Sequence, residues 1–147
     1  MSSIINKEWK LTKTVLPQHT DHAGFMWHGS YLDFLEEGRI DALNKVGTSY
    51  SELSKNGIEI PVISLEINYK KPFLHGETVI LISQFKMKNK IRLNCKTLFF
   101  KSNGDIAAEA IIEQVVVRKK NDLLKLVREI PVKIKKIFLL LEEGPKI

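Results

Sequence analysis

Apolar and polar residues follow two different repeats along this chain. Between residues 31 and 46 the apolar positions recur every three to four residues, which predicts a helix of about four turns with one buried side. Residues 8–16 and 63–70 alternate between apolar and polar side chains, which is typical of half-buried strands. Three further strands are predicted at residues 78–88, 91–101 and 106–118.

The order of these elements indicates an α+β domain. One strand precedes the long helix, a shorter helix is expected at residues 49–55, and four strands joined by short turns follow. Because one long helix must cover five antiparallel strands, we expect a curved five-stranded sheet wrapped around that helix. Its exposed edge strand favours dimerisation. A final helix is predicted at residues 132–142.

The length and composition fit one domain. A chain of 147 residues is long enough for one hydrophobic core. We expect a single domain over residues 1–147, with its core at about 8–120 and a C-terminal helical extension at about 131–143. The longest apolar run, residues 137–141, is far shorter than the roughly 20 residues of a membrane-spanning helix. The start of the chain lacks signal-peptide features, so we expect a cytoplasmic protein with no membrane partner.

The single cysteine, Cys95, excludes an internal disulfide. It shares a predicted strand face with Ile91 and Leu93, so burial is favoured over reactivity. A catalytic thiol needs an electropositive and partly exposed setting, which nothing in the neighbouring sequence provides. The sequence therefore predicts a structural role for this thiol.

Basic residues are concentrated in the last third of the chain. The formal net charge is +6, and residues 118–136 contain eight basic and two acidic side chains. This segment is interpreted either as a solvated surface, as a docking site for the phosphates of a coenzyme A nucleotide, or as a nucleic-acid contact. It contains no aromatic residue, which argues against nucleic-acid binding because bases commonly stack on aromatic side chains.

The densest group of reactive side chains lies between the first strand and the long helix. Asp21, Gly24, His28 and Tyr31 form the pattern Asp-x2-Gly-x3-His-x2-Tyr. A carboxylate that acts as base or nucleophile is thereby placed beside a helix start, whose unpaired N–H groups bind anions. The alternative is that Asp21 only caps or closes the turn. The His28 imidazole has two alternative roles, which the sequence favours equally. It either contacts the substrate or Asp21, or it forms a purely structural hydrogen bond.

The sequence lacks the motifs that are typical of several other classes of enzyme. The histidines near Asp21 match no metal-ligand spacing, so no metal is expected. There is no Gly-x-Ser-x-Gly motif and no glycine-rich phosphate loop, which argues against a serine hydrolase and a nucleotide-binding domain. Glu36 and Glu37 are further acids on the predicted helix, and we expect them to be solvent or interface residues.

Two motifs resemble those of a known family. The run Thr20-Asp21-His22-Ala23-Gly24, followed by His28, Tyr31 and a long helix, resembles the hotdog-fold acyl-CoA thioesterases of the 4-hydroxybenzoyl-CoA thioesterase type. Tyr69-Lys70-Lys71-Pro72, followed by His75-Gly76-Glu77, is similar to the Tyr-x2-Pro turn and the strand start of that family. The likeness covers residues 9–118, which is most of the chain.

The resemblance implies a fold, an assembly and a mechanism. It implies a curved antiparallel sheet around a central helix, and dimers or homotetramers with active sites at the dimer interface. Asp21 would be the catalytic carboxylate, and the backbone N–H of His28 would polarise the thioester carbonyl. Gly24 would permit the tight turn. No separate cofactor is implied, since coenzyme A is part of the substrate.

The resemblance also implies a substrate class without fixing the acyl group. Relatives with this motif hydrolyse aromatic thioesters such as 4-hydroxybenzoyl-CoA and 1,4-dihydroxy-2-naphthoyl-CoA, or short aliphatic acyl-CoAs. Trp27 and His22 depart from the commonest family residues, so they bear on the substrate more than on the chemistry. The residues expected to bind substrate are His22, Phe25, Trp27, Tyr69, Arg118, Lys119 and Lys120.

Two alternatives are carried beside the thioesterase. One is a hotdog hydratase or dehydratase. The motifs typical of those enzymes are Asp, Asn and His in one loop, or His-Phe-Pro-Gly, and this chain contains neither. The other alternative is a non-catalytic module that binds acyl-CoA, acyl carrier protein or RNA through the basic segment. Nucleic-acid binding would weaken steeply with salt, which distinguishes it from the enzyme.

Overall fold

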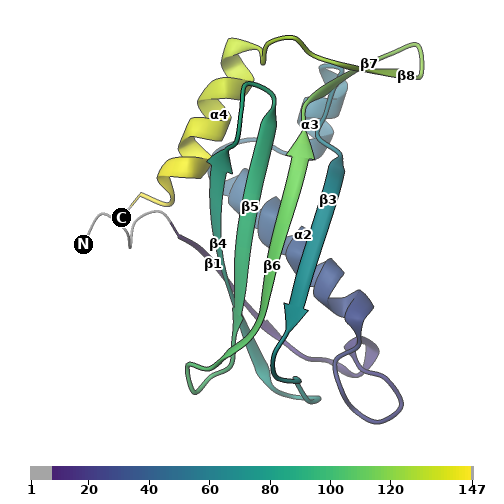
Figure 1. Ribbon diagram of the computed structural model, residues 1–147, viewed down its shortest axis with the longest axis vertical. Coiled ribbons are helices and arrows are strands. Elements are labelled where there is room, and N and C mark those ends of the chain that lie inside the picture. Colours follow the sequence, from purple (N-terminus) through teal and green to yellow (C-terminus); the bar gives the residue numbers. More distant parts are fainter. Residues whose placement is uncertain (1–7, 147) are drawn as a thin grey trace.

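The computed structural model describes residues 8–146 and has an α+β architecture, as predicted (Figure 1). Its strands are β1 (Trp9–Thr14), β2 (Ile58–Glu59), β3 (Val62–Tyr69), β4 (Thr78–Met87), β5 (Arg92–Phe100), β6 (Ile106–Val115), β7 (Val117–Lys120) and β8 (Leu123–Leu126). Its helices are the 3-10 turn η1 (Pro17–His19), α2 (His28–Lys45), α3 (Tyr50–Lys55) and α4 (Val132–Glu143).

Five strands form the main sheet in the order β1-β4-β5-β6-β3, and every neighbouring pair is antiparallel. Buried residues alternate along β4 and β5, as the period-two pattern of the sequence predicts. Strand β3 lies at one edge of the sheet, and nearly all of its residues are exposed. This edge therefore remains available for pairing with another strand.

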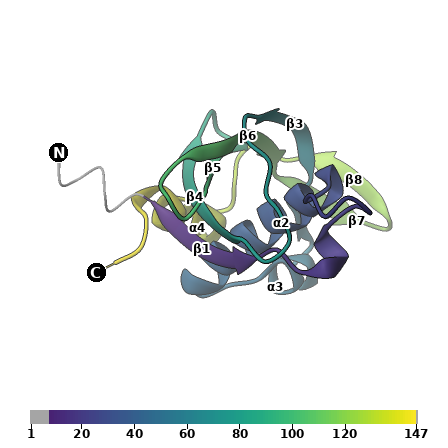
Figure 2. The same ribbon diagram turned by 90° about the horizontal axis from the view of Figure 1, so that it is seen from below.

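Helix α2 lies against one face of the sheet, with β1 and β4 as its main contacts (Figure 2). Its buried face includes Tyr31, Phe34, Leu35 and Ala42, which recur at helical spacing. The helix begins three residues before the predicted start, so His28 is its first residue. That position matters because the first N–H groups of a helix have no partner within the helix.

Helix α4 packs onto the same core, beside β4. Its apolar face buries Ile134 and Phe138, and the indole Nε1 of Trp9 donates a hydrogen bond of 2.8 Å to the carbonyl of Leu141. The Cys95 thiol is also buried in the core, as predicted, and its burial raises its pKa to about 11. No helix within residues 8–146 has the length and apolar character needed to cross a membrane.

The predicted end of the strand at residues 106–118 was wrong. The structure ends β6 at Val115 and starts β7 at Val117, and β7 belongs to a second sheet of order β2-β7-β8. The sequence interpretation missed β8. Asn121 and Asp122 both adopt positive φ (51° and 64°), which is the conformation of a two-residue hairpin turn. Their identity was the signal for this hairpin, since Asn and Asp tolerate that conformation.

Candidate active site

The loop between η1 and α2 is held as a compact unit against a distant part of the chain. Thr20 and Met26 form an isolated antiparallel bridge, and Phe25 forms another with Leu74. The N–H of Met26 donates to the carbonyl of Phe73 at 2.8 Å. The loop geometry is thus set by the chain around residues 73–75 as well as by its own sequence.

Asp21 organises this loop through one of its carboxylate oxygens. Its Oδ1 accepts hydrogen bonds from the N–H groups of Ala23 (2.9 Å) and Phe25 (3.1 Å). Gly24 has φ +84°, a conformation that favours glycine, and its N–H donates to the carbonyl of Asp21 at 3.0 Å. The carboxylate is exposed in a single chain, and its Oδ2 has no hydrogen-bond partner among residues 8–146.

The start of α2 presents an unpaired backbone donor. The N–H of Trp27 donates to the carbonyl of His19 at 3.1 Å, and that of Ser30 donates back to Trp27 at 3.0 Å. Within the described part of the chain, the N–H of His28 has no acceptor. Unpaired N–H groups at a helix start carry partial positive charge and attract an oxygen that gains negative charge.

A cleft of about 370 Å³ opens beside this helix start. It is lined by His28 and Tyr31 of α2, by Tyr69 at the end of β3 and by Met26. The Tyr31 and Tyr69 rings pack edge to face, with centroids 4.9 Å apart. We call this hollow the lower cleft, because it lies at the lower end of the sheet in Figure 1.

Burial of Tyr31 in the wall of the lower cleft raises the pKa of its phenol to about 12, and Tyr69 adds to this effect. The ring also packs on Phe99, at 5.3 Å between centroids. This tyrosine therefore stays neutral at physiological pH and serves as a rigid aromatic wall.

Two lysines complete the lower cleft, and both are held by carboxylates. Lys70 lies 3.2 Å from Glu109, and Lys71 lies 2.7 Å from Asp105. The bonded Lys71 ammonium holds the pKa of Asp105 below its ordinary value. These lysines follow Tyr69 directly in the second motif, whereas the basic residues expected from the sequence to bind substrate were Arg118, Lys119 and Lys120.

The structure brings only some of the predicted site residues together. His28 and Tyr69 line the lower cleft, whereas the side chain of Asp21 lies on the adjoining loop and does not line it. The other predicted residues on this loop and at the helix start are His22, Gly24, Phe25 and Trp27. Arg118, Lys119 and Lys120 lie on β7, at the other end of the sheet, so a single chain does not join them to the loop (Figure 1). Within residues 8–146, no three His, Cys, Asp or Glu side chains are grouped to hold a metal ion.

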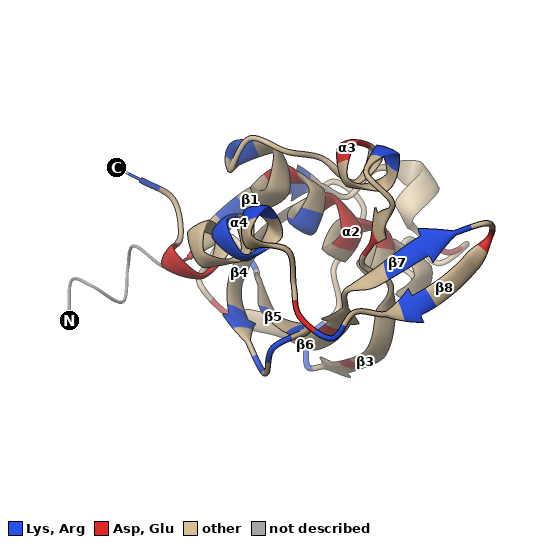
Figure 3. Cartoon of the chain, turned by 90° about the horizontal axis from the view of Figure 1, so that it is seen from above, with Lys and Arg blue, Asp and Glu red and all other residues tan. Residues whose placement is uncertain are grey.

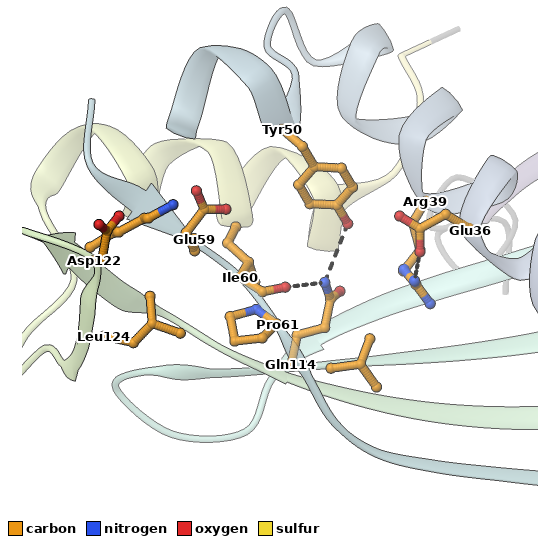
Figure 4. A pocket seen from close by; sticks show the side chains of 11 residues that line it. Glu36, Arg39, Tyr50, Glu59, Ile60, Pro61, Gln114, Asp122 and Leu124 are labelled. Carbon is orange, nitrogen blue, oxygen red and sulfur yellow. Dashed lines mark hydrogen bonds and ion pairs between the residues drawn. The ribbon is translucent and has the colours of Figure 1, made fainter. Parts of the chain in front are cut away.

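A larger hollow of about 790 Å³, the upper cavity, lies near the start of β3 (Figure 4). The Gln114 amide donates to the Tyr50 hydroxyl (3.3 Å) and to the carbonyl of Ile60 (2.8 Å). Arg39 is 6% exposed and forms an ion pair with Glu36, while its Nε is buried without a partner in the described residues. Glu36, expected to be a solvent or interface residue, is thus the half-exposed partner of a buried arginine.

Comparison with known proteins identifies the family. The sequence profile of the Thioesterase-like superfamily matches residues 15–138. A Synechocystis sp. protein described only as an esterase candidate is 33% identical over 93 residues, which are 63% of this chain and 56% of that protein. The chain therefore spans about half the length of this relative.

Two further proteins are named for an activity. The long-chain acyl-CoA thioesterase FadM of Escherichia coli is 27% identical over 103 residues, which cover 69% of this chain and 77% of FadM. The crystal structure of a DHNA-CoA thioesterase from Staphylococcus aureus superposes with a TM-score of 0.79 at 23% identity, over 90% of this chain and 89% of that one. The resemblance predicted from residues 20–31 is confirmed, and the chain belongs to the Thioesterase-like superfamily.

Proposed function

We propose that this protein is an acyl-CoA thioesterase, which hydrolyses its substrate to a free acid and coenzyme A. The observation that carries the proposal is the unpaired N–H of His28, which starts α2 between the Asp21 loop and an aromatic cleft. Family membership and the named activities of the E. coli and S. aureus relatives support it.

The proposed reaction uses two groups of this chain. The N–H of His28 donates to the thioester oxygen as negative charge develops there, and one such donor typically contributes about 3 kcal/mol. The unpaired Oδ2 of Asp21 supplies the attack, either on the carbonyl carbon directly or by taking a proton from water. In the direct route the C–S bond breaks to leave a mixed anhydride on Asp21, which water then hydrolyses to the free acid. In the other route the oxygen of the deprotonated water adds to the carbonyl carbon, and the C–S bond then breaks. In both routes coenzyme A leaves as the thiolate. Because thiolate is a good leaving group, the scheme needs no metal.

The lining of the lower cleft favours an aromatic or short acyl group. Tyr31 and Tyr69 form an edge-to-face pair in its wall, and a planar ring packs well against such a pair. Trp27 is 44% exposed next to His28, with ring centroids 5.0 Å apart, so it extends the aromatic surface at the helix start. We propose 1,4-dihydroxy-2-naphthoyl-CoA and 4-hydroxybenzoyl-CoA as candidate substrates.

We further propose that two copies complete the site by pairing along β3. This edge strand exposes Val62, Ile63, Leu65 and Tyr69, which together form an apolar edge that water disfavours. Antiparallel pairing of β3 with its copy would place the Tyr69 end of one strand beside the Val62 end of the other. The lower cleft and Asp21 of one subunit would then adjoin the upper cavity of its partner, with the sheet wrapped around α2 as in other hotdog proteins.

This arrangement gives the basic residues a role in substrate binding. Lys70 and Lys71 lie in the lower cleft, and Lys119 lines the upper cavity. In the proposed dimer these side chains come from different subunits to the same region, where the phosphates of coenzyme A would meet them.

The test is hydrolysis of a panel of aromatic and aliphatic acyl-CoAs by the wild type and by Asp21→Asn. The asparagine can still accept the hydrogen bonds of Ala23 and Phe25, so the loop is retained while the base is lost. We expect kcat to fall about 10²–10⁴-fold. Asp41→Asn, which changes an acid that pairs with Lys45 on α2 and lines neither hollow, is the matched control. Undiminished turnover by Asp21→Asn would remove this carboxylate from the mechanism.

A further inference from the structure

Lys101, the residue that follows β5, is an enclosed cation. Its side chain is 20% exposed, whereas the basic residues of β7 are exposed to solvent at the other end of the molecule (Figure 3). An ammonium that loses most of its water costs free energy unless polar partners replace that water. The partners of this lysine therefore show which part of the chain it holds.

The partners of the Lys101 ammonium lie between β3 and β4. Its Nζ donates to the Glu77 carboxylate at 2.7 Å and to the carbonyl of Pro72 at 2.6 Å. It also lies 4.8 Å from the centroid of the fully buried Phe73 ring, within range of a cation–π interaction. We call residues 72–77 the β3–β4 turn. One side chain from the end of a different strand thus contacts this turn at three residues.

The β3–β4 turn is also bonded to the loop that carries Asp21. The carbonyl of Phe73 accepts the N–H of Met26 at 2.8 Å, and the N–H of His75 donates to the carbonyl of Gly24 at 3.0 Å. The position of the loop therefore follows the position of the turn.

The contacts continue from the loop to both proposed reacting groups. The N–H of Phe25 donates to Oδ1 of Asp21 at 3.1 Å, and its carbonyl accepts the N–H of Asp21 at 2.8 Å. Met26 is separated by one residue from His28, whose N–H is the proposed donor to the thioester oxygen. A displacement of the β3–β4 turn would therefore disturb the geometry between the carboxylate and this donor.

The backbone of the β3–β4 turn has anchors of its own. The N–H of Gly76 donates to the carbonyl of Val15 at 2.8 Å, and the N–H of Val15 donates to the carbonyl of Glu77 at 2.9 Å. These bonds continue the pairing of β1 with β4, so the turn stays attached to the sheet without the lysine. Loss of the Lys101 ammonium is therefore expected to loosen the turn locally and to leave the chain folded.

We propose that Lys101 is a positioning residue for the thioester hydrolysis, an inference that rests on the proposed function. Through the β3–β4 turn, its ammonium holds the Asp21 loop where the carboxylate reaches the thioester. Lys101 does not line the lower cleft, so it acts through the turn and not by contact with the substrate. The effect on rate follows from geometry, because a displacement of about 1 Å can slow catalysis about 10²-fold.

The first arm of the experiment is steady-state kinetics of the full chain with an acyl-CoA that the wild type hydrolyses. Lys101→Met keeps the length of the side chain and removes its charge, so kcat should fall about 10- to 100-fold while KM changes less than about threefold. Lys101→Arg keeps a cation with several donors and should restore kcat to within about fivefold of the wild type. The matched control is Lys96→Met, the same change at an exposed residue of β5, which should behave like the wild type.

The second arm measures amide hydrogen exchange by mass spectrometry and does not depend on turnover. In Lys101→Met, exchange should accelerate at least about tenfold in residues 21–28 and 72–77 and stay unchanged in β4 and β5. A purely structural role would instead accelerate exchange throughout the sheet. Glu77→Gln leaves the lysine its other two contacts, and it should accelerate the same two segments by a few-fold. This milder variant decides the question if Lys101→Met does not fold.

Four results would overturn the proposal. They are unchanged kcat in Lys101→Met, an equal loss in Lys96→Met, no recovery in Lys101→Arg, and exchange that rises uniformly or not at all in the variant that folds. If the wild type hydrolyses no acyl-CoA, the proposed function fails instead, and the exchange arm still decides whether Lys101 holds the loop. The two failures are therefore distinguishable.

Discussion

The two hollows at the ends of the main sheet differ in size and in the state of their polar groups. The upper cavity is the larger, at about 790 Å³, but Gln114, Tyr50, Arg39 and Glu36 are bonded to one another or to the backbone, and the buried Nε of Arg39 is the exception. The lower cleft, at about 370 Å³, adjoins a helix start whose N–H at His28 has no partner in the described residues. Volume alone would select the upper cavity, whereas the proposed chemistry uses the unpaired groups beside the lower cleft.

Among the changes that test this contrast between the two hollows, removal of the free N–H has the largest expected effect. His28→Pro removes this donor, and proline is tolerated at the first residue of a helix. The preceding Trp27 already has the extended backbone (φ −86°, ψ 158°) that proline requires of its neighbour. We expect kcat to fall about 10²–10³-fold while the helical circular dichroism signal is retained.

The control for this prediction is His28→Ala, which keeps the N–H and removes only the imidazole. If the backbone donor is what matters, the alanine variant should stay within roughly tenfold of the wild type. Equal losses in the two variants would instead assign the effect to the imidazole side chain, and the contrast between the hollows would lose its basis.

A middle-sized effect concerns the stability of the lower cleft at high pH. Tyr31 has a pKa of about 12 in the folded chain against about 10 when unfolded, so the unfolded chain loses this proton first as pH rises. Its contribution is therefore complete below pH 10 and is lost between about pH 10 and 12, by roughly 2–3 kcal/mol in total. Tyr31→Phe should show a shallower decline of unfolding free energy over that range.

Urea unfolding of both proteins at several pH values provides this measurement. The Cys95 thiol, with its pKa raised to about 11, also reduces stability in this range, but it does so equally in both proteins. The difference between them therefore isolates Tyr31. Parallel curves would mean that the phenol is hydrated in the folded state.

The smallest expected effect belongs to the upper cavity. Glu36→Gln removes the ionic partner of the buried Arg39 and leaves its guanidinium without a counter-charge. Since Glu36 is itself half-exposed, we expect a loss of only about 1–2 kcal/mol in unfolding free energy. Turnover should change less than about twofold, because a bonded pair in this cavity takes no part in the proposed chemistry. A large loss of kcat with unchanged stability would show that this pair acts on substrate.

Local patterns in the sequence were enough for most elements of the fold. The spacing of Tyr31, Phe34, Leu35 and Ala42 predicted α2, and simple alternation predicted β4 and β5. These patterns were sufficient because the side-chain period within a single helix or strand decides which of its residues face the core. The loop motif around Asp21 also predicted the family, because several spaced positions agreed at once.

Patterns failed where a segment depends on a distant one. Strand β8 has no alternation, since all four of its residues are exposed, and only its pairing with β7 makes it a strand. The position of the lysines in the lower cleft also depends on a distant segment. Lys70 and Lys71 line this cleft because the end of β3 packs beside α2, whereas charge density in the sequence points to Arg118, Lys119 and Lys120.

The sequence by itself determined the fold class, the family and the helix that starts beside a carboxylate, because backbone propensity and side-chain period act over short distances. Only the tertiary structure decided which polar groups stay unpaired. That property depends on contacts between remote segments, such as the bond from Met26 to Phe73 that seats the loop against the sheet. The exposure of β8 has the same origin, since it depends on which remote segments pack against the strand.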